Sequence, residues 1–309
     1  MPGETRRGAS SRIRPIRRWK RWFGVISLLM APVLAAVVLV PSGSEGASTP
    51  TSVNVLYAGS LLDLMVQHLA PAFQRVSGDH VVGFPGGSLA LASEIKGGIE
   101  VGDVLISASP IADWRLHGAT NGNWVTSYIK FGASPLVLGY RQSSRFASQL
   151  ARKPWYTVVT RPGFILGRTD PVTDPKGRLA LTALDEAAAR FHRPALAALA
   201  HSASNIYPET TLVGRLQSGQ LDAGFFYAVE AKASHLRTVP LVGVSLRGVF
   251  TVAVLRGAPH VAAARAFVAF LLGRHGRKIL AADGIVPFKD PVRVRSFAMT
   301  SAVGAVATP

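Results

Sequence analysis

Residues 53–62, V-N-V-L-Y-A-G-S-L-L, pass from a short apolar run through a glycine turn into an apolar helical pattern. The run predicts a strand over Val53–Tyr57, and Gly59 permits the tight turn that follows it. The spacing of the next apolar residues predicts a helix over Leu61–Val76, which Pro71 should kink or divide. A strand, a loop and a helix in this order form the unit from which α/β folds are built.

The same unit recurs along the chain. Apolar runs between turn-forming residues predict further strands at His80–Phe84, Val104–Ser107, Pro135–Tyr140, Phe164–Arg168, Leu221–Tyr227 and Val249–Leu255. Helical spacing predicts helices at Leu89–Lys96, Leu179–Phe191, Thr211–Ser218 and Val261–Leu280. Alternation of this kind indicates mostly parallel sheets flanked by helices, so the predicted fold class is α/β.

The composition supports a packed globular protein. With 309 residues the chain is long enough for one large or two medium domains. Hydrophobic residues make up 48% and charged residues 17%, which excludes an intrinsically disordered chain. Cysteine is absent, so disulfides, thiolate zinc sites, cysteine nucleophiles and a lipid anchor on cysteine are excluded.

The basic N-terminus and the apolar segment after it indicate export. Residues 1–22 contain eight basic residues and one acidic residue, and so carry +7 of the formal charge of +17. Phe23–Val40 is then apolar, which makes residues 23–41 a signal peptide or a membrane anchor, and residues 42–52 a linker. The positive-inside rule places everything after residue 41 outside the cell membrane. The remaining basic residues form no cluster with aromatics, so we expect no nucleic-acid partner.

Two loops combine glycine with serine at the start of a predicted helix. Gly59 and Ser60 form the first, and Gly87 and Ser88 form the second, in F-P-G-G-S-L-A. Each serine sits where a helix N-cap belongs. Taken alone, either loop favours a cap over a ligand role for its serine; taken together, the hydroxyls and helix-start amides form two clusters of the kind that binds oxyanions. Neither loop has the lysine of a phosphate-binding P-loop.

Three acidic residues follow the later strands. Asp170 and Asp174 each precede a proline in T-D-P-V-T-D-P-K-G, Glu209 begins a helix after Y-P, and Tyr227 ends a strand. Acids at helix starts are ordinary partners of the helix dipole, and spacing alone does not separate that role from ligand binding. A hydrolase that uses Asp170, Asp174 and Glu209 is an alternative of another class, but the chain has no nucleophile elbow and no metal-ligand motif.

These segments, in this order, resemble a known family. The segments V-L-Y-A-G-S-L, G-G-S-L-A, G-D-V-L-I-S-A-S, R-P-G-F-I-L-G-R-T-D-P-V-T-D-P-K-G, and Y-P-E-T with G-Q-L-D-A-G-F-F-Y are similar to those of extracytoplasmic molybdate/tungstate-binding proteins of ABC importers. The resemblance spans about residues 53–285. It implies the two-lobed periplasmic-binding-protein fold of type II, with two α/β lobes and the ligand held in the cleft between them.

The resemblance also implies the ligand residues. These are Ser60, Ser88, Asp174, Glu209 and Tyr227, with Gly59, Gly87 and Asp170 as weaker candidates. Hydroxyls and amides would bind the oxo groups, whereas carboxylates repel a dianion unless they contact its central atom. Molybdenum(VI) and tungsten(VI) can expand from four to six oxygen ligands, so Asp174 and Glu209 would supply the two extra oxygens. Asp170 takes that role if Asp174 only caps its helix.

The resemblance further implies how the chain is organised and with what it works. We expect lobe 1 to comprise residues 53–131 and 229–290, lobe 2 residues 132–228, and a tail residues 291–309, with hinges near Lys130–Ala133 and Ala228–Glu230. We expect an exported monomer that is not an enzyme, needs no cofactor, and delivers the oxyanion to ABC permease and ATPase subunits. The alternative ligand is another tetrahedral oxyanion: sulfate, thiosulfate or phosphate.

Overall fold

The computed structural model describes residues 51–295, whose strands form a mixed sheet in the order β2-β1-β3-β9-β4-β7-β5-β6, with β8 and β10 also paired to β4. The strands are β1 (Ser52–Ala58), β2 (His80–Gly86), β3 (Val104–Ser107), β4 (Tyr128–Tyr140), β5 (Leu166–Thr169), β6 (Ile206–Tyr207), β7 (Ala223–Tyr227), β8 (Arg237–Pro240), β9 (Arg247–Val254) and β10 (Val286–Val294). The N-terminal basic segment, the apolar segment 23–40 and most of the expected tail lie outside the described residues. None of the helices in residues 51–295 is long and apolar enough to cross a membrane.

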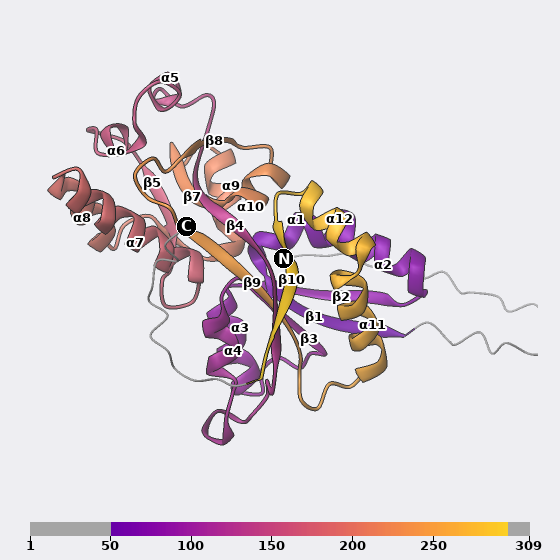
Figure 1. The fold of residues 1–309 in the computed structure, drawn as a ribbon. Coiled ribbons are helices and arrows are strands. Elements are labelled where there is room, and N and C mark those ends of the chain that lie inside the picture. The colour runs from indigo at the N-terminus through magenta and orange to yellow at the C-terminus, as the bar shows by residue number, and fades with distance from the viewer. Residues whose placement is uncertain (1–50, 296–309) are drawn as a thin grey trace, which may run out of the picture. The chain divides into compact units, whose positions relative to one another are not determined.

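Strand β4 connects two groups of elements (Figure 1). Its first half, Ile129–Pro135, pairs antiparallel with β9, which continues to β3 and the parallel strands β1 and β2. Its second half, Leu136–Tyr140, pairs antiparallel with β7, which continues to the parallel strands β5 and β6. The two-lobed α/β fold that the sequence predicts is therefore confirmed, with β4 as a member of both lobes.

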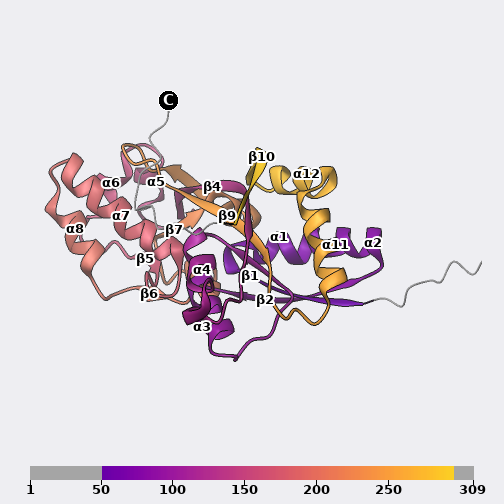
Figure 2. The same ribbon diagram turned by 60° about the horizontal axis from the view of Figure 1, so that its bottom comes forward.

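Helices flank the sheet in both lobes (Figures 1 and 2). The longer ones are α2 (Ala70–Ser77), α3 (Ser88–Lys96), α7 (Pro175–Arg190), α8 (Pro194–His201), α11 (Val261–Leu272) and α12 (Arg274–Ala282). The shorter α-helices are α1 (Leu62–Leu64), α4 (Pro110–Arg115), α5 (Ala147–Leu150), α6 (Trp155–Val158), α9 (Leu212–Gln217) and α10 (Ala228–Ala233). Single turns η1 (Gly59–Leu61), η3 (Ala119–Asn121) and η4 (Glu209–Thr211) are 3-10 helices, and η2 (Met65–Leu69) is a π-helix.

Two predicted helices are interrupted. The first is divided as expected, because the π-turn η2 lies between α1 and α2, immediately before Pro71, which has no N–H to continue the α-helical hydrogen bonds. The predicted single helix over Val261–Leu280 is wrong. Gly273 has an extended backbone and ends α11 before α12 begins, and a side chain there would press on the carbonyl oxygen of Ala269 at 3.0 Å.

The structure also contains strands that the sequence pattern did not predict. β8 is short and mostly exposed, and it pairs with β4 over Val137–Tyr140. β10 contains two prolines and pairs with the first half of β4 on either side of an irregularity. It reaches Val294, past residue 291 at which the expected tail begins, so residues 291–294 belong to a strand. The lobe boundaries themselves stay a prediction.

Candidate functional site

The turn after β1 brings Gly59 and Ser60 against Glu209, although 148 residues lie between Ser60 and Glu209. A Cβ on Gly59 would lie 1.6 Å from Glu209 Oε2, so only glycine leaves room for this carboxylate. The Ser60 hydroxyl is buried and has no hydrogen-bond partner among residues 51–295. The prediction that Ser60 is an N-cap is wrong, because Ala58 holds that position and Ser60 lies within η1.

The second glycine–serine loop meets the segment that carries Asp174. A Cβ on Gly87 would lie 2.5 Å from the carbonyl oxygen of Thr173 and 3.5 Å from Asp174 Cβ. That carbonyl accepts hydrogen bonds from the amides of Leu89 and Ala90 at the start of α3, both at 3.0 Å. A loop of lobe 1 thus binds a loop of lobe 2 through the backbone.

Ser88 is fully buried in this loop, but its role differs from the one that its position suggested. Gly87 is the N-cap of α3, so the prediction of Ser88 as N-cap is wrong. Its hydroxyl instead accepts a hydrogen bond from the amide of Ala108, after β3, at 3.0 Å. This bond leaves the Ser88 hydroxyl proton free to be donated elsewhere.

Asp174 both caps α7 and keeps one oxygen free. Its Oδ1 accepts a hydrogen bond from the amide of Lys176 at 3.1 Å, while Oδ2 is buried without a hydrogen-bond partner in the described chain. Burial raises the pKa of Asp174, and Lys176 opposes this rise. Asp170 is more exposed, and its Oδ1 accepts a hydrogen bond from the amide of Val172. Of the two acids that the sequence left as alternative ligands, Asp174 is thus the one with a buried, unpaired oxygen.

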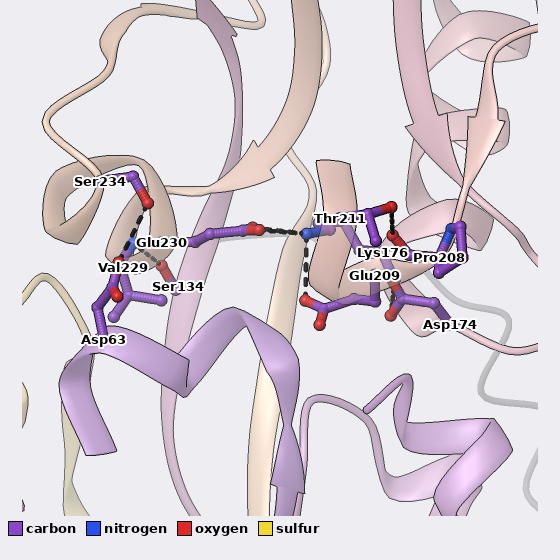
Figure 3. A network of polar contacts seen from close by, with 10 residues as sticks. All are labelled: Asp63, Ser134, Asp174, Lys176, Pro208, Glu209, Thr211, Val229, Glu230 and Ser234. Atoms are coloured by element: carbon purple, nitrogen blue, oxygen red, sulfur yellow. Dashed lines mark hydrogen bonds and ion pairs between the residues drawn. The ribbon is translucent and has the colours of Figure 1, made fainter. Parts of the chain in front are cut away.

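Glu209 lies at the start of η4, where Lys176 holds one of its oxygens (Figure 3). Lys176 Nζ donates to Glu209 Oε1 at 3.3 Å and to the oxygens of Glu230 at 2.7 and 2.6 Å. Glu209 Oε2 is buried without a hydrogen-bond partner in residues 51–295. Burial raises the pKa of Glu209 well above its usual range, against the opposing effect of Lys176.

Tyr227 ends β7, and its ring is covered by β9. A side chain on Gly248 would meet the Tyr227 ring at 2.6 Å, and Phe250 packs edge-on against the same ring. The Tyr227 hydroxyl is buried and unpaired as far as the structure describes the chain. Burial raises the pKa of Tyr227 strongly, and the charges of Asp174, Glu209 and Glu230 add to the rise. The tyrosine therefore stays a neutral donor close to the carboxylates.

A cavity of about 760 Å³ reaches part of this site from outside. Ser60, Glu209 and Glu230 line it together with side chains of α1, η2, α9 and α10. Ser60 and Glu209 come from different lobes, so the cavity lies between elements of both.

The structure thus brings most of the predicted residues together. Gly59, Ser60 and Glu209 meet on one side, and Gly87 and Asp174 meet on the other. Asp174, Glu209 and Tyr227 influence one another electrostatically. Sequence reasoning missed Lys176 and Glu230 as part of the site. Lys176 stands in the D-P-K-G segment that the resemblance singled out, but no sequence feature marks it as buried.

Two α/β lobes that share strand β4, with buried polar groups from the loops of both lobes gathered where they meet, define the class of two-lobed binding proteins. The sulfate-binding protein SubI of Mycobacterium tuberculosis has the same fold, with a TM-score of 0.60 at 19% identity over 77% of this chain and 88% of that one. The periplasmic molybdate-binding protein of Azotobacter vinelandii gives a TM-score of 0.58 at 20% identity, over 76% of this chain and 98% of that one.

Residues 53–286 match the family model of bacterial extracellular solute-binding proteins, and the chain belongs to that family. The molybdate/tungstate-binding protein WtpA of Thermococcus kodakarensis is 24% identical, over 82% of this chain and 89% of its own length. The predicted family resemblance is therefore confirmed.

Proposed function

We propose that this chain captures molybdate or tungstate outside the cell membrane and delivers it to an ABC importer. One observation carries the proposal: Ser60 Oγ, Asp174 Oδ2, Glu209 Oε2 and Tyr227 OH are all buried and unpaired within the described residues. Buried polar atoms are nearly always hydrogen-bonded, and here two donors and two carboxylate oxygens from both lobes lack partners together. The similarity to WtpA gives the same ligand class independently.

The mixture of groups selects among oxyanions. The hydroxyls of Ser60, Ser88 and Tyr227 can donate to oxo groups of a dianion. Asp174 Oδ2 and Glu209 Oε2 would repel any dianion unless they bind its central atom. Molybdenum(VI) and tungsten(VI) accept two further oxygens, whereas sulfur in sulfate does not. The carboxylates would therefore attract the metal oxyanions and disfavour sulfate or phosphate.

The proposal includes how the ligand is delivered. The amides of α3 bind the carbonyl oxygen of Thr173 across the two lobes, so a ligand held by residues of both lobes would favour the arrangement in which these loops touch. The permease would recognise the closed monomer, and the ATPase subunits would drive transport. The apolar segment 23–40 would direct export and, if retained, anchor the chain. We assign no catalytic activity and no cofactor.

Thermal unfolding of the full chain, freed of bound ligand, tests the proposal. Molybdate or tungstate at ~100 times its dissociation constant should stabilise the protein by about 2.7 kcal/mol, which raises the melting temperature by about 5–10 °C. Sulfate, thiosulfate and phosphate at the same concentration should have little effect. Absence of a shift with both metal oxyanions would refute the proposal, and a shift with sulfate alone would favour the alternative ligand.

Carboxylate variants test the metal contacts. Glu209→Gln and Asp174→Asn should each weaken tungstate binding by about 10- to 100-fold, because each removes one charged oxygen from the central atom. Asparagine still caps a helix, so Asp174→Asn should leave α7 intact. Glu186→Gln, on the exposed side of α7, is the matched control and should bind normally. Weakening by Asp170→Asn instead would move the ligand role to Asp170.

A further inference from the structure

Lys176 is fully buried, and three carboxylates surround it (Figure 3). An ammonium group has three N–H donors, and the structure gives three hydrogen bonds: two to Glu230 and one to Glu209 Oε1. Phe226 and Tyr227 present ring faces to Nζ at 5.5 and 5.9 Å. The ammonium group therefore has no donor left for a ligand, and its position is fixed by groups that surround it.

The same bonds fix the orientation of the Glu209 carboxylate. With Oε1 held by Lys176, rotation of the Glu209 carboxylate is restricted, and Oε2 remains against Gly59 in the turn that also carries Ser60. Glu230, in the first turn of α10, anchors the lysine by two short bonds. The start of α10 is held in turn, because the Ser134 hydroxyl accepts a hydrogen bond from the amide of Val229 at 3.1 Å. The chain of contacts thus runs from β4 through α10 and Lys176 to Glu209.

We propose that Lys176, anchored by Glu230, is the positioning residue that directs Glu209 Oε2 toward the central atom of the bound oxyanion. The inference rests on the proposed function and names the residues that determine its selectivity. A carboxylate free to rotate would accept hydrogen bonds in many orientations, but a bond to the metal needs one oxygen at one place. Lys176 would thereby favour six-coordinate molybdate and tungstate over oxyanions that stay tetrahedral.

The test must separate positioning from simple charge and from stability. Lys176→Met alone would leave two carboxylates unpaired in the interior, which is strongly destabilising. The double variant Lys176→Met/Glu230→Gln removes one positive and one negative charge, so the net charge near the ligand is unchanged. Lys278→Met is the matched control, because Lys278 lies on α12, is exposed, and does not line the cavity that reaches the site.

Calorimetry with tungstate and X-ray absorption of bound molybdate provide the readouts. The double variant should fold, bind tungstate about 10- to 100-fold more weakly, and hold molybdate with fewer than six oxygen neighbours. Lys176→Arg, which keeps the charge and the donors, should retain six neighbours, and Lys278→Met should match the wild type. A purely structural role would change stability without changing the coordination number.

Two results would contradict these proposals, and they differ in which proposal they overturn. A folded double variant with wild-type affinity and six oxygen neighbours would overturn the role of Lys176 and leave the proposed function intact. Failure of the wild-type protein to bind either metal oxyanion would overturn the proposed function itself.

Discussion

Gly59→Ala tests whether the close approach of the Gly59 turn to Glu209 matters for binding. The added Cβ would lie 1.6 Å from Glu209 Oε2 and 2.8 Å from Glu209 Cδ. Non-bonded carbon contacts settle near ~3.5 Å, so the carboxylate must move by about 2 Å. A displacement of this size would take Oε2 away from its place beside Ser60.

The change should affect binding far more than folding. Gly59 does not have a positive φ, so alanine fits its backbone and should stabilise by about 0.4–1 kcal/mol through the unfolded state. Oε2 has no partner among the described residues, so the cost in stability is confined to the 3.3 Å bond from Lys176 to Oε1, which the shift strains and which opposes that gain. We therefore expect a free energy of unfolding within about 1 kcal/mol of the wild type, and tungstate affinity lower by about 10- to 100-fold.

Urea unfolding and isothermal calorimetry measure the two effects on the same protein. Gly214→Ala in α9 is the control, because nothing lies within 4 Å of its added Cβ and its φ is not positive. Gly214 lines the same cavity as Gly59, so this variant also shows whether an added methyl group in the cavity weakens binding by itself. The reasoning fails if Gly59→Ala binds tungstate as tightly as the wild type, or if Gly214→Ala weakens binding equally.

Two further buried groups give predictions. Burial raises the pKa of Asp113 to about 7, although a hydrogen bond from Thr251 opposes the rise. The folded protein therefore keeps a proton that the unfolded chain releases near pH ~4, so stability should fall from about pH 4 to pH 7 by up to about 4 kcal/mol. Asp113→Asn should flatten this fall in melting curves; an unchanged slope would contradict the assignment. Tyr227→Phe removes an unpaired buried hydroxyl, so the ligand-free protein should gain about 1 kcal/mol in urea unfolding while tungstate affinity falls about tenfold. Equal affinity in the two proteins would show that this hydroxyl does not meet the ligand.

The fold was predictable where burial makes a strand uniformly apolar. β1 and β3 are buried on both faces, and their apolar runs gave strand positions within one or two residues. β10 contains two prolines and is largely exposed, so neither its composition nor its alternation indicates a strand. Its place is set by the edge of β4, which is a tertiary property that local sequence does not encode.

The site was predictable only in part, for a similar reason. The resemblance identified Ser60, Asp174, Glu209 and Tyr227, because those residues stand in recognisable segments. A lysine near the start of a helix is normally a surface residue. No feature of the neighbouring sequence shows that Lys176 is buried among three carboxylates. The sequence places Glu230 only at the end of the expected hinge Ala228–Glu230. Such a pair becomes visible only when residues from separate elements are brought together.

The charge of the site affects which oxyanions it can bind. Asp174, Glu209 and Glu230 face one ammonium group, and burial raises the pKa of all three acids, so a dianion enters a region with no surplus of positive charge. Each unit-charge repulsion at 4 Å costs about 4 kcal/mol at an effective dielectric constant of 20. Sulfate has no means to offset that cost, whereas a metal oxyanion offsets it by bonding to two of the carboxylates. In the proposed function, a site poor in positive charge is therefore better suited to molybdate and tungstate than a basic pocket, which would bind every dianion alike.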